Sequence, residues 1–168
     1  ARNFNDHFDE RDNDRRGWSL ALRGRPFGRS SIEVGLEYET GALHARGDLS
    51  SSPIADDDVS YRFHAASFGV DIRWKARRGG RLEFDFRRES RDFTSANAFD
   101  FCHSTREDDR RDYRALLVQH LARGLDLVAE IRRLFNDAGF PGVFSSCEEV
   151  TDFVENRVSV GLSWSHRF

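Results

Sequence analysis

Histidine side chains are the residues of this chain best suited to acid–base chemistry near neutral pH. Three of the six, His7, His44 and His103, fall in stretches that we expect to be loops. Catalysis by histidine also needs a nucleophile and an acid at suitable positions, and His103-Ser104 is the nearest approach to such a pair. No nucleophile-elbow, Walker or paired metal-ligand motif occurs. The sequence therefore predicts no catalytic residue, no metal site and no cofactor, and we do not expect an enzyme.

Charged side chains alternate instead with apolar ones. In the stretch 32–39 one set of alternate positions is apolar, while the other consists almost wholly of Glu. The stretches 18–23, 67–75, 82–87 and 157–165 alternate in the same way. Because successive side chains of a β-strand point to opposite faces, each stretch predicts a strand with one apolar and one polar face.

The polar faces carry nearly balanced charge. Burying unpaired ions in a dry core is costly, so we expect these side chains to line the inside of a barrel, as a ladder of ion pairs or around a hydrated pore. The predicted lumen-lining acids are Glu33, Glu37, Glu39, Asp71, Glu83, Asp85, Glu89, Asp126 and Glu130. The predicted bases are Arg23, Arg62, Arg73, Lys75, Arg87, Arg91, Arg114, Arg132, Arg157 and Arg167.

The connections between the predicted strands alternate in length. Short ones at 24–29, 77–80 and 123–124 take turns with long polar ones around 7–12, 41–57, 96–108 and 137–152. All three prolines fall in connections, as hydrogen-bonded strands require. This alternation predicts an antiparallel up-and-down order.

The stretch 113–135 also fits the 3.6-residue period of a helix. We expect a hairpin there, because the stretch aligns with the alternating hairpin 11–38 and because Arg123-Gly124 stands where a turn is needed. Residues 1–6 resemble the strand ends at 91–95 and 133–137, and so predict the end of a strand whose beginning is absent. The all-β chain, 1–168, is therefore either one barrel domain of about eight strand segments or the C-terminal part of a larger barrel.

All Trp and Tyr residues fall near the ends of the predicted strands. Indole and phenol rings favour the boundary between hydrocarbon and water, and outer-membrane barrels carry two such bands flanking an apolar belt. The positions therefore predict two aromatic girdles of a transmembrane barrel. Trp18, Tyr38, Tyr61 and Tyr113 lie near the long loops, and Trp74 and Trp164 near the opposite strand ends.

The C-terminal stretch 158–168 resembles the last strand of bacterial outer-membrane β-barrels. Val160, Leu162 and Trp164 stand at alternate positions and the stretch ends in Phe168, although His166 departs from the aromatic usual in that family. The resemblance implies recognition of this strand by the barrel-assembly machinery. It also implies an outer-membrane location with periplasmic short turns and extracellular long loops.

With this orientation, two further predictions follow. Arg88 and Arg133 are expected on the lipid face near the outer strand ends, where lipopolysaccharide phosphates could meet them. Cys102 and Cys147 are expected in long extracellular loops, and we expect a disulfide between them, because export through the periplasm allows such bonds to form.

The composition limits the function classes further. With 26 basic and 29 acidic residues the chain lacks the basic excess typical of nucleic-acid binding, and no apolar stretch reaches the length of a membrane-spanning helix. We expect a passive pore, or an export conduit for a polysaccharide or another polar solute. The alternative is a small closed barrel with a structural or surface-binding role through its extracellular loops.

Overall fold

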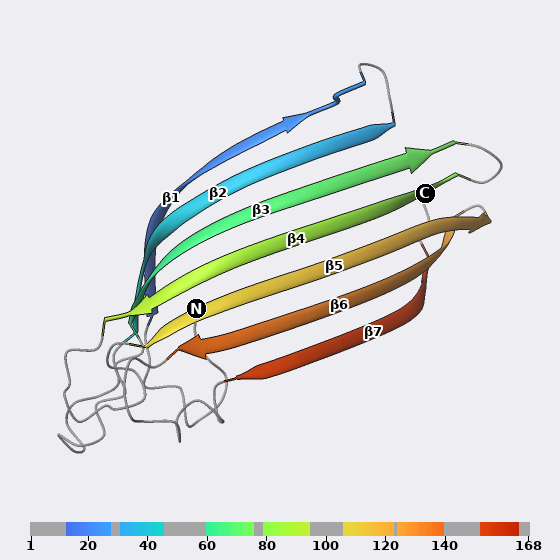
Figure 1. The fold of residues 1–168 in the computed structure, drawn as a ribbon. Helices are drawn as coiled ribbons and strands as arrows, with labels where there is room; N and C mark the ends of the chain where they lie inside the picture. Colours follow the sequence, from blue (N-terminus) through green and yellow to red (C-terminus); the bar gives the residue numbers. More distant parts are fainter. Residues whose placement is uncertain are drawn as a thin grey trace.

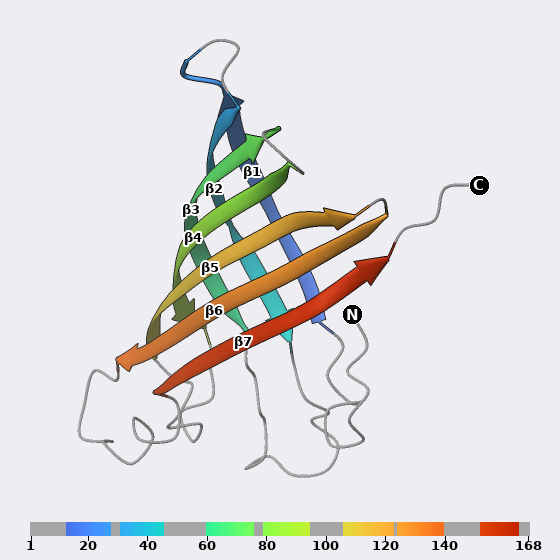
Figure 2. The same cartoon turned by 90° about the vertical axis from the view of Figure 1, so that its right-hand side faces the viewer.

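The computed structural model describes residues 13–27, 31–45, 60–75, 79–94, 106–122, 124–139 and 152–164. They form one antiparallel sheet in which each strand pairs with the next along the chain, as Figures 1 and 2 show. The strands are β1 (Asn13–Gly24), β2 (Ile32–Ala45), β3 (Tyr61–Trp74), β4 (Gly80–Phe93), β5 (Glu107–Ala122), β6 (Leu125–Gly139) and β7 (Phe153–Trp164). The predicted all-β, up-and-down architecture is confirmed.

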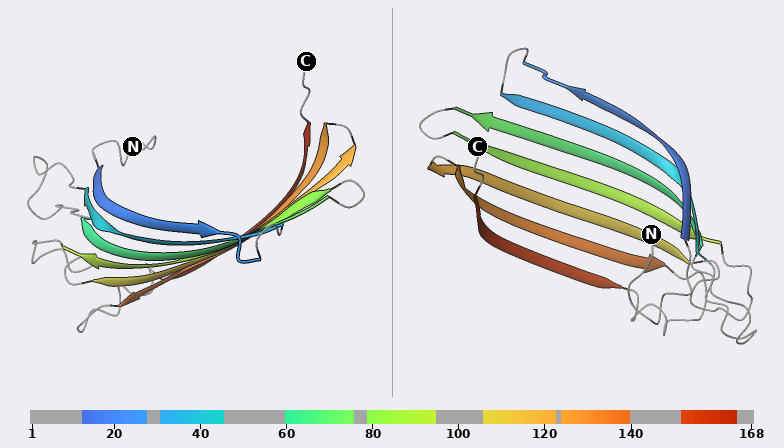
Figure 3. Two further views of the ribbon diagram at one scale, coloured as in Figure 1. Left: turned by 90° about the horizontal axis from the view of Figure 1, so that it is seen from above. Right: turned by 180° about the vertical axis from the view of Figure 1, so that it is seen from behind.

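The sheet is curved and twisted, and it does not close into a barrel. Figure 3 shows β1 and β7 at its two separate edges. Within the described residues β1 pairs only with β2, and β7 only with β6. The predicted eighth segment at residues 1–6 lies outside the described residues.

The two ends of the sheet differ in how the strands are connected. At the turn end, the connections 25–31, 75–79 and 123–124 are short, whereas at the loop end the connections 46–60, 94–106 and 140–152 are longer. Gly79 and Gly124 stand in two of the turns with φ values of 71° and 76°, a conformation that favours glycine. The predicted alternation of short and long connections is confirmed.

The stretch 113–135 forms a β-hairpin rather than a helix. β5 and β6 pair from Glu107 and Gly139 at the loop end to Ala122 and Leu125 at the turn, with one irregularity near His120. β5 also pairs with β4, and β6 also pairs with β7, so both strands of the hairpin lie inside the sheet. The stretch has apolar residues that fit the period of a helix or of a strand, and here it forms strands. The predicted hairpin is confirmed.

Strand β2 is longer than the sequence predicts, because a loop was expected from residue 41. Gly41 instead pairs directly with Gly17 of β1. A Cβ atom at residue 41 would lie 2.8 Å from the Gly17 Cα and closer still to the Arg16 carbonyl oxygen. The glycine pair therefore lets the two backbones approach closely where β1 and β2 bend, near their loop ends in Figure 1.

The buried part of the sheet lies on its charged face. Phe63, Ala65, Leu134 and Ala138 are buried, and all four lie in the loop-end halves of β3 and β6. Each is an even number of residues away from the inward charged residues of its strand, such as Asp71 on β3 and Arg132 on β6, and therefore lies on the same face. The opposite face carries most of the exposed large apolar side chains.

Candidate functional site

The apolar face forms a belt across the sheet. The strand register places apolar residues opposite one another in continuous rows. One row consists of Val34, Val70, Phe84, Ala115, Ile131 and Val158. Such a broad exposed apolar surface is typical of a binding or membrane-facing surface. We call this face the outer belt.

All but one of the predicted girdle residues lie on the same face as the outer belt. The Trp18 and Tyr38 rings are 5.6 Å apart, and the Tyr113 ring lies 4.9 Å from that of Phe86. At the turn end, the Trp74 ring covers Gly80, which has no side chain to occupy that space. Trp164 is highly exposed at the edge of the sheet.

Tyr61 differs from the other predicted girdle residues, because it lies on the charged face. Its ring contacts those of Phe63 and Phe93, with centroids 6.3 Å and 5.4 Å away. The physical reason is strand parity: residue 61 shares a face with residues 67, 69 and 71 when the strand continues without a bulge. Its position near a strand end therefore does not place it in the girdle.

The predicted lumen-lining residues that lie within strands share one face, which we call the inner face, with the exception of Arg62. Arg62 lies on the outer face, opposite Ala42 and Asp92. Lys75 follows β3 and is exposed, and Arg167 lies outside the described residues. The inner-face set comprises Arg23, Glu33, Glu37, Glu39, Asp71, Arg73, Glu83, Asp85, Arg87, Glu89, Arg91, Arg114, Asp126, Glu130, Arg132 and Arg157.

The inner face also holds charged residues that the sequence analysis did not select. They are Arg15, Arg81, Asp108, Arg110, Asp112 and Glu155. Arg81 is two residues from Glu83 and therefore lies on the same face of β4. The three β5 residues are likewise an even number of residues from Arg114 and lie on its face. Extending the alternation beyond the central residues of each strand would have identified them.

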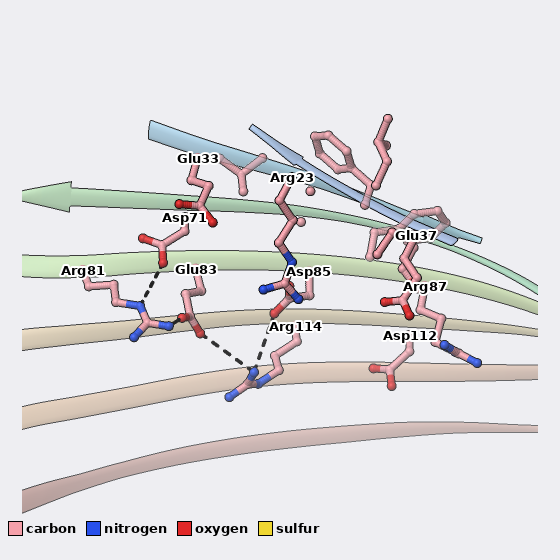
Figure 4. Close-up of a pocket in the computed structure, with 18 of the residues that line it drawn as sticks. Arg23, Glu33, Glu37, Asp71, Arg81, Glu83, Asp85, Arg87, Asp112 and Arg114 are labelled. Atoms are coloured by element: carbon pink, nitrogen blue, oxygen red, sulfur yellow. Dashed lines mark ion pairs between the residues drawn. The ribbon is translucent and has the colours of Figure 1, made fainter. Parts of the chain in front are cut away.

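An open hollow of about 730 Å³ lies over the turn-end half of the inner face and extends as far as Arg87 and Asp112 towards the loop end (Figure 4). Carboxylates and guanidinium groups of neighbouring strands pair across it. Asp71 accepts from Arg73 at 2.9 Å and lies 3.2 Å from Arg81. Arg114 lies 3.1 Å from Glu130. It also lies 3.6 Å from Asp85 and 4.0 Å from Glu83, two carboxylates that line the hollow. We call this region the turn-end hollow.

Two charged residues in the turn-end hollow differ from these pairs. Glu37 and Arg23 line it, yet neither makes an ion pair within the described part of the chain. Figure 4 shows both side chains among the labelled residues of the hollow. Their charges are therefore not neutralised by an ion pair within the described residues.

The loop-end half of the inner face is packed. Glu39 lies 2.7 Å from Arg15 and 2.9 Å from Arg87, so it links β1 to β4 across β3. Glu89 is paired with Arg87 at 2.8 Å and with Arg91 at 2.6 Å. Ala65 stands between Glu39 and Glu89 in the register, and its small size lets the long side chains meet above it.

Aromatic rings complete this packed region. The guanidinium of Arg15 lies 4.2 Å from the centroid of Phe63, and that of Arg91 lies 4.8 Å from the centroid of Tyr61. Phe63 is only 1% exposed. We call this region the loop-end cluster; it consists of Arg15, Glu39, Tyr61, Phe63, Ala65, Arg87, Glu89 and Arg91.

A second polar group lies on the outer face, on the loop-end side of Tyr113. Asp109 accepts hydrogen bonds from Arg88 at 2.9 Å and from Arg111 at 2.7 Å. Burial by itself raises the pKa of the Asp109 carboxyl, but the hydrogen bonds from these two guanidinium groups outweigh it and hold the pKa below its usual value. Arg133, which also lies on this face, stacks 4.5 Å from the Phe135 centroid.

Two of the described histidines contact other polar side chains. His64 Nδ1 lies 2.9 Å from the Thr40 hydroxyl and 3.1 Å from the Tyr38 hydroxyl. His120 lies 2.5 Å from Asp126, and Asp126 is opposite Ser163 on the next strand. The carboxylate thus stands between the imidazole and the hydroxyl, whereas a catalytic triad has the imidazole in the middle. The described ranges contain no group of three or more His, Cys, Asp or Glu side chains placed to hold a metal ion.

Several predicted residues lie outside the described residues. They include Cys102 and Cys147, the His103-Ser104 pair, and Phe168 of the assembly motif. Val160, Leu162 and Trp164 of that motif are described, and they form the exposed outer face of β7.

The chain matches no protein-family model, no curated protein and no solved structure. In the part of the chain that the structure describes, no helix is long and apolar enough to cross a membrane.

Proposed function

We propose that this sheet is the wall of a bacterial outer-membrane β-barrel that acts as a passive conduit for polar solutes, such as a polysaccharide. The observation that carries the proposal is the contrast between the two faces of the sheet. The outer belt is predominantly apolar, and the inner face behind it is charged and hollow. In water the outer belt would remain exposed, whereas in a bilayer it would face hydrocarbon.

The height of the outer belt supports a membrane. On β3 the outward apolar residues run from Ala66 to Trp74, which corresponds to about 27 Å along a strand. A strand tilt of 35–45° reduces this to about 20 Å across the membrane, close to the roughly 25 Å band of outer-membrane barrels. Tyr113, near the loop end, and Trp164, at the turn end, lie near the borders of the apolar region.

The expected partners follow from this placement. Turn ends would face the periplasm and loop ends the cell exterior, with Arg88 and Arg133 near lipopolysaccharide phosphates. The barrel-assembly machinery would recognise β7 together with Phe168. Removal of Phe168 should then lower the amount of protein in the outer membrane much more than it lowers the stability of protein already folded. Normal surface levels of the truncated protein would contradict this assignment.

Conductance in a planar bilayer tests the conduit directly. The intact protein should give steady ohmic steps. Glu37→Lys should then shift the reversal potential in a KCl gradient towards anion preference, because residue 37 lines the turn-end hollow without an ion pair. Glu107→Lys is the matched control: it makes the same change of charge on the outer face and should leave the reversal potential unchanged.

The loop-end cluster favours a second candidate, a closed barrel with a structural or surface-binding role. Its ion pairs and buried Phe63 fill the inner face at that end. A barrel of eight strands has an interior just wide enough for side chains to fill. Bilayers containing folded protein but showing no steady steps would favour this candidate over the conduit.

A further inference from the structure

Arg110 is an inward arginine of the loop-end half that lacks an ion-pair partner. It lies on β5, opposite Glu89 of β4 and Asn136 of β6, and it is partly buried. Among the residues that the structure describes, its guanidinium makes no ion pair and no hydrogen bond. Partial burial therefore removes hydration from this cation, and no direct partner replaces it.

The carboxylate opposite Arg110 on β4 is already engaged. Glu89 accepts hydrogen bonds from Arg87 at 2.8 Å and from Arg91 at 2.6 Å. Each of these arginines faces a different oxygen of the carboxylate. Glu89 is therefore shared between two other guanidinium groups.

The two carboxylates beside Arg110 on its own strand are engaged as well. Asp108 accepts two hydrogen bonds of 2.6 Å from Arg106, one at each oxygen. Asp112 accepts hydrogen bonds from Arg132 at 2.9 Å and 3.1 Å. Because inward residues of a strand are two apart, these are the nearest acids of β5 on this face. The acids around Arg110 thus serve other arginines, and its own positive charge is in excess.

The electrostatic surroundings of Arg110 reflect this excess. Arg110 lies on the loop-end side of Tyr113, beyond the apolar region of the outer belt. Burial lowers the pKa of its guanidinium below the usual value, and the positive charge of Arg91 lowers that pKa further. The carboxylates of Glu89 and Asp112 act in the opposite direction but do not offset these two causes. Arginine remains charged at neutral pH, so an anion beside it would be stabilising.

The turn-end hollow brings open space close to Arg110. Its loop-end limit is formed by Arg87 and Asp112, which Figure 4 labels on the side away from Arg81. These two residues are paired in the register, and the next inward row towards the loop end contains Glu89 and Arg110. Inward rows are about 7 Å apart along a strand, a distance that an arginine side chain can span. A solute group at this limit of the hollow is therefore within reach of the Arg110 guanidinium.

We propose that Arg110 binds an oxyanion, the carboxylate or phosphate group of a solute, at the loop-end limit of the turn-end hollow. The planar guanidinium fork matches two oxygens of either group, and partial burial strengthens such a pair. Arg132, which pairs with Asp112 in the wall of the hollow, adds positive charge beside the site. The proposal rests on the proposed conduit only for the entry of the solute, and it narrows the solute class to anionic molecules.

Calorimetric titration of the intact protein in detergent micelles tests the site without requiring conduction. Three probes share one sugar ring: glucose 6-phosphate carries a phosphate, glucuronate carries a carboxylate, and glucose carries no charge. We expect at least one of the anionic sugars to bind, and glucose to give no measurable heat of binding. Arg110→Gln should weaken the binding about tenfold or more, the loss expected for a hydrogen bond to a charged group.

Arg111→Gln is the matched control, because it removes the same charge from the next residue of β5 on the outer face. Its affinity for the anionic sugars should equal that of the unmodified protein. Urea unfolding without ligand tests whether Arg110 has a structural role instead. Arg110→Gln should keep the urea midpoint of the unmodified protein or raise it, because no ion pair is broken. A lower midpoint would show that Arg110 has a structural partner, and would overturn the proposal.

The outcomes of the titration are distinct. Binding of only one anionic sugar would support the site and identify the bound group as phosphate or carboxylate. Absence of binding by both anionic sugars, equal binding of glucose, or binding that Arg110→Gln leaves unchanged would overturn the proposal. Binding that depends on Arg110 in a protein that gives no conductance steps would refute the conduit and leave the site standing, so the two failures can be distinguished.

Discussion

The loop-end cluster and the turn-end hollow use the same residue types on the same face, yet they differ in packing. In the loop-end cluster the side chain of Glu89 is only 7% exposed, whereas in the turn-end hollow that of Asp85 is 52% exposed. Aromatic rings of Tyr61 and Phe63 accompany the ion pairs at the loop end. At the turn end Gly35 and Gly69 line the hollow instead, and they leave space.

This difference shows that the neighbours of an ion pair determine its role. Paired charges that are buried against rings have few alternative arrangements, so removing one partner is costly. Paired charges beside glycine and solvent can exchange partners, as the several carboxylates around Arg114 illustrate. We therefore expect the loop-end cluster to contribute more to stability and the turn-end hollow to contribute more to interaction with solutes.

The largest effect is expected from Phe63→Ala. Its buried ring would leave a cavity beneath Arg15, and loss of a buried Phe side chain costs about 3–5 kcal/mol of unfolding free energy. Phe84→Ala is the matched control on the outer belt, where partial exposure should limit the loss to about half as much. Urea unfolding in detergent micelles measures both values. Equal losses would show that the loop-end cluster is not a core.

Gly41→Ala should give the next largest effect. The added Cβ would overlap the backbone of β1 near Gly17, and relief of such overlap costs about 1–3 kcal/mol. Gly161→Ala is the control, because a Cβ there meets no atom within 4 Å. The same unfolding measurement should show a loss for residue 41 and little change for residue 161. An unchanged stability of Gly41→Ala would contradict a close approach of β1 and β2.

The sequence was sufficient to predict much of the fold. The alternation of apolar and polar residues in 32–39 and 67–75 predicted both the strands and the face of each residue. A shift of the strand register by one residue would move the apolar side chains to the opposite face, so the pattern fixes the faces. The hairpin 113–135 needed the Arg123-Gly124 turn as additional evidence, since its apolar residues also fit a helix. Barrel closure was predicted from the charged faces, the aromatic positions and the resemblance of the C-terminal stretch, and it is not seen in the described sheet.

The residues of the candidate site could be predicted where the alternation of faces along each strand was used to assign them. Tyr61 was assigned from its position near a strand end, and Arg62 from its charge, whereas the strand register places each on the opposite face. The difference between the loop-end cluster and the turn-end hollow could not be predicted. It depends on which residues of different strands become neighbours, such as Ala65 between Glu39 and Glu89.

Glu89→Gln should give an effect comparable to that of Gly41→Ala. The substitution removes the charge that holds Arg87 and Arg91, and loss of such buried charged hydrogen bonds costs about 1.5–3 kcal/mol. Glu155→Gln is the matched control. Its exposed pair with Arg157 should contribute less than about 1 kcal/mol. If the two substitutions destabilise equally, the burial of Glu89 does not determine the strength of its ion pairs.

The smallest effect on stability is expected from Arg114→Gln. Arg114 is 38% exposed and lies near Glu83, Asp85 and Glu130, so solvent and the remaining pairs should limit the loss to below about 1 kcal/mol. The hollow nevertheless loses one positive charge. Asp85 and Glu130 lose their ion-pair partner, whereas Glu83 keeps its pair with Arg81.

The reversal potential in a KCl gradient should therefore shift towards cation preference for Arg114→Gln. Arg111→Gln is the matched control, because it removes the same charge from the same strand on the outer face. A large loss of stability for Arg114→Gln would mean that the turn-end hollow is packed like the loop-end cluster. An equal shift for both variants would mean that the inner face does not determine ion preference, and the functional difference between the two regions would then have no basis.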